Sequence, residues 1–305
     1  MPTEEQLVTA AYLEHLNDAD VSLLAGPSHG RDPRELRRLL VERRGGVGDL
    51  LGKPEVFDAV FGPEGAPLVQ LSPFLAFAVA IDRVLRKLET ASYVPERVGW
   101  GKGALVFDTA RLVEFGSSPW RRLFLAELLA SYTRVASGSV MVASRRGWRR
   151  QRFSELDPVR LAGLLEVVPE AERPGIWRRL GDLALFLTGV FPDYVERQGF
   201  GPVAEGRLRR LTKGAPRQVS GPPSASRGQA GWAQTADDQG PVGLLEMLGR
   251  RWYEAAFSSV PRPVPTSLAV LGELPERFDE ARRVLSLVTD TFLFPMRGRW
   301  FGLGV

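Results

Sequence analysis

The densest group of chemically active side chains is an arginine-rich stretch with a tryptophan, between Ser137 and Asp157. Guanidinium groups bind phosphates through charge-assisted hydrogen bonds, and a tryptophan can stack on a base. The stretch opens with the alternating run SVMVAS, bends near Gly147 and returns through RRQRF, which predicts a β-hairpin over about 138–153. The residues that could contact a nucleic acid are Arg145, Arg146, Trp148, Arg149, Arg150 and Arg152.

The same stretch has a simpler interpretation as a solvated hairpin, with its arginines paired to acidic helices and Trp148 covering apolar surface. It is not framed by an RNP pattern, a zinc finger or a clear helix-turn-helix. Two further basic clusters, RELRRLLVERRG at 34–45 and GRLRRLTKG at 206–214, compete with it as anion sites. Nucleic-acid binding therefore stays one of two interpretations.

A second candidate is Asp182, a carboxylate in the otherwise apolar run RRLGDLALFL. A buried carboxylate must find a partner or be neutralised, and such residues are enriched at acid–base and ligand sites. The alternative is a structural ion pair with Arg178, with Arg179 or with an arginine of a neighbouring helix. A ligand pocket near Asp182 is the functional hypothesis for this residue.

Aromatic residues beside arginines form a third candidate, because these types dominate the energetics of protein interfaces. The C-terminal region supplies two such groups, which predict a protein partner. They consist of Arg250, Arg251, Trp252 and Tyr253, and of Trp300 and Phe301 in the tail. The alternative is that these aromatic side chains pack on the protein's own core.

The composition excludes several kinds of chemistry. Cysteine is absent and histidine occurs twice, at His15 and His29, so thiolate catalysis, disulfides and multi-histidine metal centres are excluded for a single chain. No P-loop, dinucleotide-binding or GxSxG motif is present, and the glycine-rich GWGKGALVFD lacks the spacing of a phosphate loop. We expect no cofactor and no metal, and favour a protein that is not an enzyme.

Charge and hydropathy suggest the broad class. The formal net charge is +4 and the pI about 9.7. Only four of the 40 basic residues are lysines, as in proteins of GC-rich bacterial genomes, although a polyanionic partner would also explain an arginine excess. No apolar run reaches the roughly 20 residues that span a bilayer, and the acidic N-terminus does not resemble a signal peptide. We therefore expect a cytoplasmic protein without a membrane span.

Helical periodicity dominates the elements that must position these residues. Helix starts are predicted at Thr3, Asp32-Pro33, Ser72-Pro73 and Asp157-Pro158, and a break is predicted at Pro192. The expected fold is all-α, an irregular multi-helix globular fold with one short β-hairpin.

The expected domains follow the change in composition after residue 211. A helical domain is predicted over 1–211, a flexible linker over the Gly-, Pro- and Ser-rich segment 212–239, and a C-terminal helical segment over 240–305 that packs on the first domain.

Three functions fit these observations. The first is a non-enzymatic helical interaction or regulatory protein that acts through protein–protein contacts. The second is a nucleic-acid-associated protein that contacts phosphates through the hairpin. The third is an enzyme or small-ligand binder with a pocket near Asp182.

Overall fold

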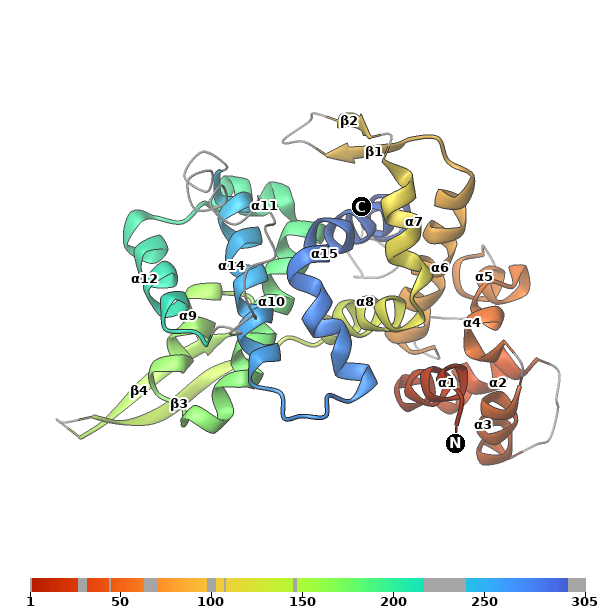
Figure 1. The fold of residues 1–305 in the computed structure, drawn as a ribbon, viewed down its shortest axis with the longest axis horizontal. Coiled ribbons are helices and arrows are strands. Elements are labelled where there is room, and N and C mark those ends of the chain that lie inside the picture. Colours follow the sequence, from red (N-terminus) through yellow and green to blue (C-terminus); the bar gives the residue numbers. More distant parts are fainter. Residues whose placement is uncertain are drawn as a thin grey trace. The chain divides into compact units, whose positions relative to one another are not determined.

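Helices make up most of the chain, and Figure 1 shows them coloured along the sequence from the N-terminus to the C-terminus. This computed structural model describes residues 2–26, 32–43, 45–62, 71–97, 103–106, 108–144, 147–216 and 240–295. The predicted all-α class is confirmed, and a β-hairpin lies where the sequence predicts it.

The first elements in chain order are α1 (Glu4–His15), α2 (Asp18–Ala25), α3 (Pro33–Glu42), α4 (Gly46–Leu51), α5 (Pro54–Phe61), α6 (Pro73–Thr90), β1 (Val94–Arg97), β2 (Gly103–Val106), α7 (Thr109–Ser117) and α8 (Pro119–Ser131). They are followed by β3 (Ser137–Ser144), β4 (Gly147–Ser154), α9 (Pro158–Ala162), the 3₁₀ helices η1 (Gly163–Glu166) and η2 (Glu170–Glu172), α10 (Arg173–Val190), α11 (Pro192–Gln198), α12 (Pro202–Lys213), α14 (Gly240–Ser258), α15 (Thr266–Val288) and the π-helical turn η3 (Thr289–Leu293). Among the described strands, β1 pairs with β2 and β3 pairs with β4, and only the second pair was predicted.

Local sequence signals set the helix starts. The Thr3 hydroxyl accepts a hydrogen bond from the Gln6 amide, and the Gln6 side chain accepts one from the Thr3 amide, which forms a capping box at α1. The Ser72 hydroxyl accepts from the Leu75 amide at the start of α6. The break between α10 and α11 falls at Pro192, because proline cannot continue the backbone hydrogen bonds of a helix.

The chain divides into two compact units. Unit 1 comprises Met1–Glu96, Ala104–Thr133 and Arg283–Val305, and unit 2 comprises Arg97–Gly103 and Arg134–Arg282. Each unit is thus assembled from segments that are distant in the sequence.

This division differs from the expected domains. The boundary near residue 133 falls inside the predicted domain 1–211. Helix α14, from the predicted C-terminal segment, packs on α10, which belongs to the predicted domain 1–211. Of the predicted linker, 212–239, the residues from 217 onward lie outside the described part of the chain. The unit boundary follows from which helices pack together.

Helix α6 is the centre of unit 1. Every residue from Phe74 to Asp82 is buried, as its all-round apolar pattern predicts. Both α7 and α8 pack on this helix. A Cβ at Gly116 of α7 would collide with the Leu85 side chain, so glycine is what allows α7 to approach.

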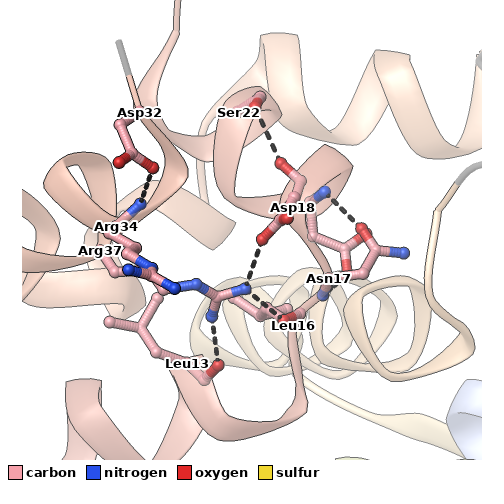
Figure 2. Close-up of polar contacts among 9 residues, drawn as sticks. Leu13, Leu16, Asn17, Asp18, Ser22, Asp32, Arg34 and Arg37 are labelled. Carbon is pink, nitrogen blue, oxygen red and sulfur yellow. Dashed lines mark hydrogen bonds and ion pairs between the residues drawn. The ribbon is translucent and has the colours of Figure 1, made fainter.

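An arginine of α3 fixes the turn between α1 and α2. Arg37 donates hydrogen bonds to the carbonyls of Leu13 (2.7 Å) and Leu16 (2.9 Å) and to the Asp18 carboxylate (3.0 Å), as Figure 2 shows. The two carbonyls belong to the end of α1, where backbone acceptors lack intrahelical partners. Arg37 therefore has a structural role, although its cluster at 34–45 was a candidate anion site.

A histidine–glutamate pair connects α1 to α8. His15 Nε2 lies 3.0 Å from Glu127 Oε1, and the imidazole stacks on Phe74 with ring centroids 4.7 Å apart. The hydrogen bond to Glu127 raises the pKa of His15 above its ordinary value, although burial acts in the opposite direction. The pair therefore favours the protonated imidazole in the folded state.

Unit 2 is built around the contact between α10 and α14. A Cβ at Gly181 of α10 would lie 2.8 Å from the Tyr253 ring, and a Cβ at Gly249 of α14 would lie 2.8 Å from both the Ala184 Cβ and the Phe278 ring. Both glycines thus remove the side chain that would hold the helices apart. These two glycines, which interrupt otherwise helical patterns in the sequence, are contact points of the core.

We expect Gly249→Ala to destabilise unit 2 by about 1–3 kcal/mol, because the added methyl group overpacks the α10–α14 contact. The measurement is the free energy of unfolding in urea. The control is Gly206→Ala in α12, where a Cβ meets no atom within 4 Å and alanine should stabilise the helix by up to about 1 kcal/mol. Equal effects of the two substitutions would contradict the proposed close approach.

We expect the contribution of the His15–Glu127 pair to stability to depend on pH. Because folding raises the pKa of His15, this contribution is fully present below the unfolded pKa of about 6.5 and is lost as pH rises through the folded pKa. The loss of unfolding free energy caused by Glu127→Gln should therefore be larger at about pH 5.5 than at about pH 8.5. A loss that does not change with pH would show that the pair is not coupled to protonation.

Candidate nucleic-acid interface

Strands β3 and β4 form a regular antiparallel arm in unit 2. Their register runs from Ser137 opposite Ser154 to Ser144 opposite Gly147. Gly147 is therefore the first residue of the returning strand, and the two residues that connect the strands are Arg145 and Arg146. The arm extends away from the helices of its unit (Figure 1).

One face of the arm carries two exposed arginines. Arg150 and Arg152 are exposed and stand opposite Met141 and Ser139 in the register. The Met141 side chain is 58% exposed, so this face is open to solvent. Arg150 Nε donates to the Ser139 hydroxyl (2.7 Å), which orients the guanidinium along the arm.

The opposite face of the arm carries the aromatic side chain of Phe153. Phe153 alternates with Arg152 and is partly buried, and a Cβ at Gly138 would lie 3.3 Å from the Phe153 ring. Helix α9 packs against β4. Glycine at position 138 leaves room for the Phe153 ring.

Glu155 fixes the base of the arm. Its carboxylate accepts from the Ala136 amide (2.9 Å) and from Arg179 Nη2 of α10 (3.2 Å), and its own amide donates to the Ala136 carbonyl (3.1 Å). Both charged side chains are partly buried, which makes the pair stronger than an exposed ion pair. Sequence reasoning missed Glu155, although it is the first acid after the arginine run.

The arm carries positive charge without local compensation. No Asp or Glu occurs from residue 128 to 154, a segment with six arginines. Within the described part of the chain, neither Arg150 nor Arg152 forms an ion pair. The arginines of this face therefore remain available to an anion.

The predicted site has four further members. Two of them, Trp148 and Arg149, stand opposite Ala143 and Val142 in the register of the arm. Arg145 and Arg146 lie outside the described residues.

A second basic cluster lies in the same unit as the arm. Helix α12 and strand β4 both contact α9. Within α12, Arg207 pairs with Glu166 (2.7 Å) and Arg209 pairs with Glu205 (2.8 Å), so their charges are compensated. Arg210 and Lys213 of α12 are exposed and form no ion pair among the described residues, so this helix also keeps basic side chains without acidic partners.

The predicted protein-contact residues of α14 belong to the interior. Trp252 and Tyr253 are both 0% exposed. The Trp252 indole donates to the Thr212 hydroxyl (2.9 Å). Neither side chain is accessible to a partner, because tertiary packing in unit 2 buries both.

The neighbouring arginines also have internal partners. Arg250 donates to the Pro275 carbonyl (2.8 Å) and pairs with Asp279 (2.6 Å), and Arg251 donates to the Ala215 carbonyl (2.7 Å) and pairs with Glu254 (2.8 Å). Trp300 and Phe301, the remaining residues of that prediction, lie outside the described part of the chain.

Asp182 is buried and has structural partners. Its Oδ1 accepts from the Tyr253 hydroxyl (2.9 Å), and its Oδ2 lies 3.9 Å from Arg178 Nε. Arg178 was among the predicted ion-pair partners, whereas Tyr253 lies 71 residues away in the sequence and could not be predicted. These contacts explain a carboxylate inside α10 without a ligand.

No protein-family model, no curated protein and no solved structure matches this chain. Within the described ranges, no group of three or more acidic or histidine side chains is placed to hold a metal ion. No helix of that same part of the chain is long and apolar enough to cross a membrane.

We expect Glu155→Ala to loosen the arm, because it removes the acceptor for both Ala136 and Arg179. Amide hydrogen exchange in β3 and β4 should become roughly tenfold faster, as the loss of these two hydrogen bonds implies. Glu155→Gln is the matched control, since its carbonyl oxygen can still accept both hydrogen bonds. Unchanged exchange in Glu155→Ala would show that the arm is held by other contacts.

Proposed function

We propose that this chain is a nucleic-acid-associated protein that contacts phosphate groups through the β3–β4 arm. The observation that carries the proposal is the exposure of Arg150 and Arg152 on one face without an ion-pair partner among the described residues. An arginine without an acidic partner can bind a phosphate, because the guanidinium donates two parallel hydrogen bonds to the phosphate oxygens.

The shape of the arm supports the same proposal. Two strands of eight residues span roughly 26 Å at about 3.3 Å per residue. A two-stranded ribbon fits the major groove of B-DNA, and the same ribbon can follow a single strand. The anchored base supports binding further, because an arm that is already ordered loses less entropy on binding.

The expected contacts are with the backbone rather than with base edges. Arginine contacts to phosphate position a protein on a nucleic acid and carry no sequence information by themselves. The proposed activity is therefore sequence-tolerant association, with Trp148 as the candidate for stacking on a base.

Protein–protein contact through the C-terminal tail stays a prediction for Trp300 and Phe301. The structure describes two other aromatic residues of this hypothesis, Trp252 and Tyr253. Both are buried and do not support it. The Asp182 pocket is not part of the proposal, because Tyr253 and Arg178 already explain this carboxylate.

The test is the salt dependence of binding to a labelled duplex and to its single strand, measured by fluorescence anisotropy. Counterion release contributes about 0.9 to the slope of log K against log salt for each phosphate contact on duplex DNA. Replacing Arg150 and Arg152 by Gln should therefore reduce that slope by about 1.8 and weaken binding at low salt.

The matched control replaces Arg34 and Arg38 by Gln. This variant loses the same charge from exposed positions on α3 of unit 1. The arm variant should lose affinity while the control retains most of it. Equal losses would mean that net charge, rather than the arm, attracts the nucleic acid, and binding that is absent or independent of salt would overturn the proposal.

A further inference from the structure

Unit 1 contains a cavity that the proposed function does not use. Its volume is about 430 Å³, within the range of sites for small molecules. Residues of α1, α4, α6 and α8 line it, together with Gly45 before α4 and Thr3 before α1. The apolar part of the lining consists of Val8, Leu51, Ala78 and Pro119.

A tyrosine with an unused hydroxyl lines this cavity. Tyr12 is only 3% exposed, and its ring packs against Phe74 with centroids 5.8 Å apart. Among the residues that the structure describes, none forms a hydrogen bond with the Tyr12 hydroxyl. The hydroxyl itself is not sealed from solvent, so it is open to the cavity, where a ligand can accept its hydrogen bond.

Burial also keeps the Tyr12 hydroxyl protonated, so that it can act as a hydrogen-bond donor. Removal from water raises the pKa of Tyr12 far above its ordinary value; the charge of Arg122 lowers this pKa, and the charges of Asp82 and Glu127 raise it. The phenol therefore stays protonated at neutral pH and can donate a hydrogen bond.

Arg122 lines the same cavity, and part of its guanidinium has no hydrogen-bond acceptor among the described residues. Its Nε donates to the Gly116 carbonyl (2.5 Å), and its Nη1 makes a long contact of 3.4 Å with Asp82. Asp82 is 2% exposed and has a closer partner in Arg86, at 2.7 Å. The Asp82 charge is thus compensated mainly by Arg86, which leaves the Arg122 guanidinium able to bind a second acceptor.

The remaining charges limit the ligand to a single negative charge. Glu4 and Glu5 belong to the lining and are exposed in the first turn of α1, where the helix dipole stabilises acids. Their charges disfavour a dianion, whereas one carboxylate at Arg122 and Tyr12 would be matched by the guanidinium.

We infer that this cavity binds a small monocarboxylate with an apolar body. The carboxylate accepts hydrogen bonds from the Tyr12 hydroxyl and the Arg122 guanidinium, and the apolar body lies against Val8, Leu51 and Ala78. This site belongs to unit 1 and does not depend on the arm of unit 2.

Isothermal titration calorimetry of the full chain tests the inference, with octanoate as the probe. Octanol has the same apolar body without the charge, and octanedioate adds a second charge. Octanoate should bind at least about tenfold more tightly than either, because it alone offers one charged acceptor. No binding of octanoate, or equal binding of octanol or octanedioate, would overturn the inference.

Two substitutions locate the site without threatening the fold. Tyr12→Phe removes a hydroxyl that has no partner among the described residues, and it should weaken octanoate binding by roughly tenfold. Gly48→Phe should obstruct the cavity, because Gly48 lines it and a Cβ there meets no atom within 4 Å. Gly206→Phe is the control, with equally open space on α12 of unit 2.

The control should bind octanoate like the unmodified chain. If either Tyr12→Phe or Gly48→Phe leaves the Kd unchanged, octanoate does not occupy this cavity, and the inference fails. Thermal unfolding of each variant confirms that the protein is folded during the titration.

Discussion

The close packing of α10 on α14 is the contact on which unit 2 depends. Gly181 and Gly249 lack the side chains that would separate the two helices, so Tyr253 and Phe278 can fill the space between them. This approach also brings the Tyr253 hydroxyl within 2.9 Å of Asp182, which gives the buried carboxylate its hydrogen bond. Van der Waals contact and polar satisfaction are therefore coupled, since moving the helices apart would weaken both.

The same helix connects this core to the exposed arm. Arg179 of α10 binds Glu155 at the base of β4, so the arm is attached to a helix of the unit's core. This attachment matters for any anion that the arm binds. Arginines on a loose hairpin would lose conformational entropy on binding, and this loss would offset part of the binding free energy. The packing of α10 therefore helps to hold the arm, and our proposed function relies on the surface of this arm.

Much of the fold could be predicted because its signals are local. The caps at Thr3 and Ser72, the break at Pro192 and the alternating strand at 137–144 depend on residues within a few positions of one another. Long-range partners leave no such trace. Trp252 was interpreted as a surface anchor because arginines precede it, yet its indole bonds to Thr212, 40 residues away, in the core. Periodicity alone does not tell which aromatic face of a helix is covered by another helix.

The two sites differ in how far the sequence could reveal them. The arm was predictable in position because a run of arginines without acids is visible along a single segment, and its two strands are adjacent in the chain. The cavity was not predictable, because Tyr12 of α1, Asp82 of α6 and Arg122 of α8 meet only after their helices have packed. Each of these residues has an ordinary role in isolation: a core aromatic, a helix ion pair and a surface arginine. Tertiary structure brings them together at the Tyr12 hydroxyl, and only this arrangement allows the carboxylate binding that we propose.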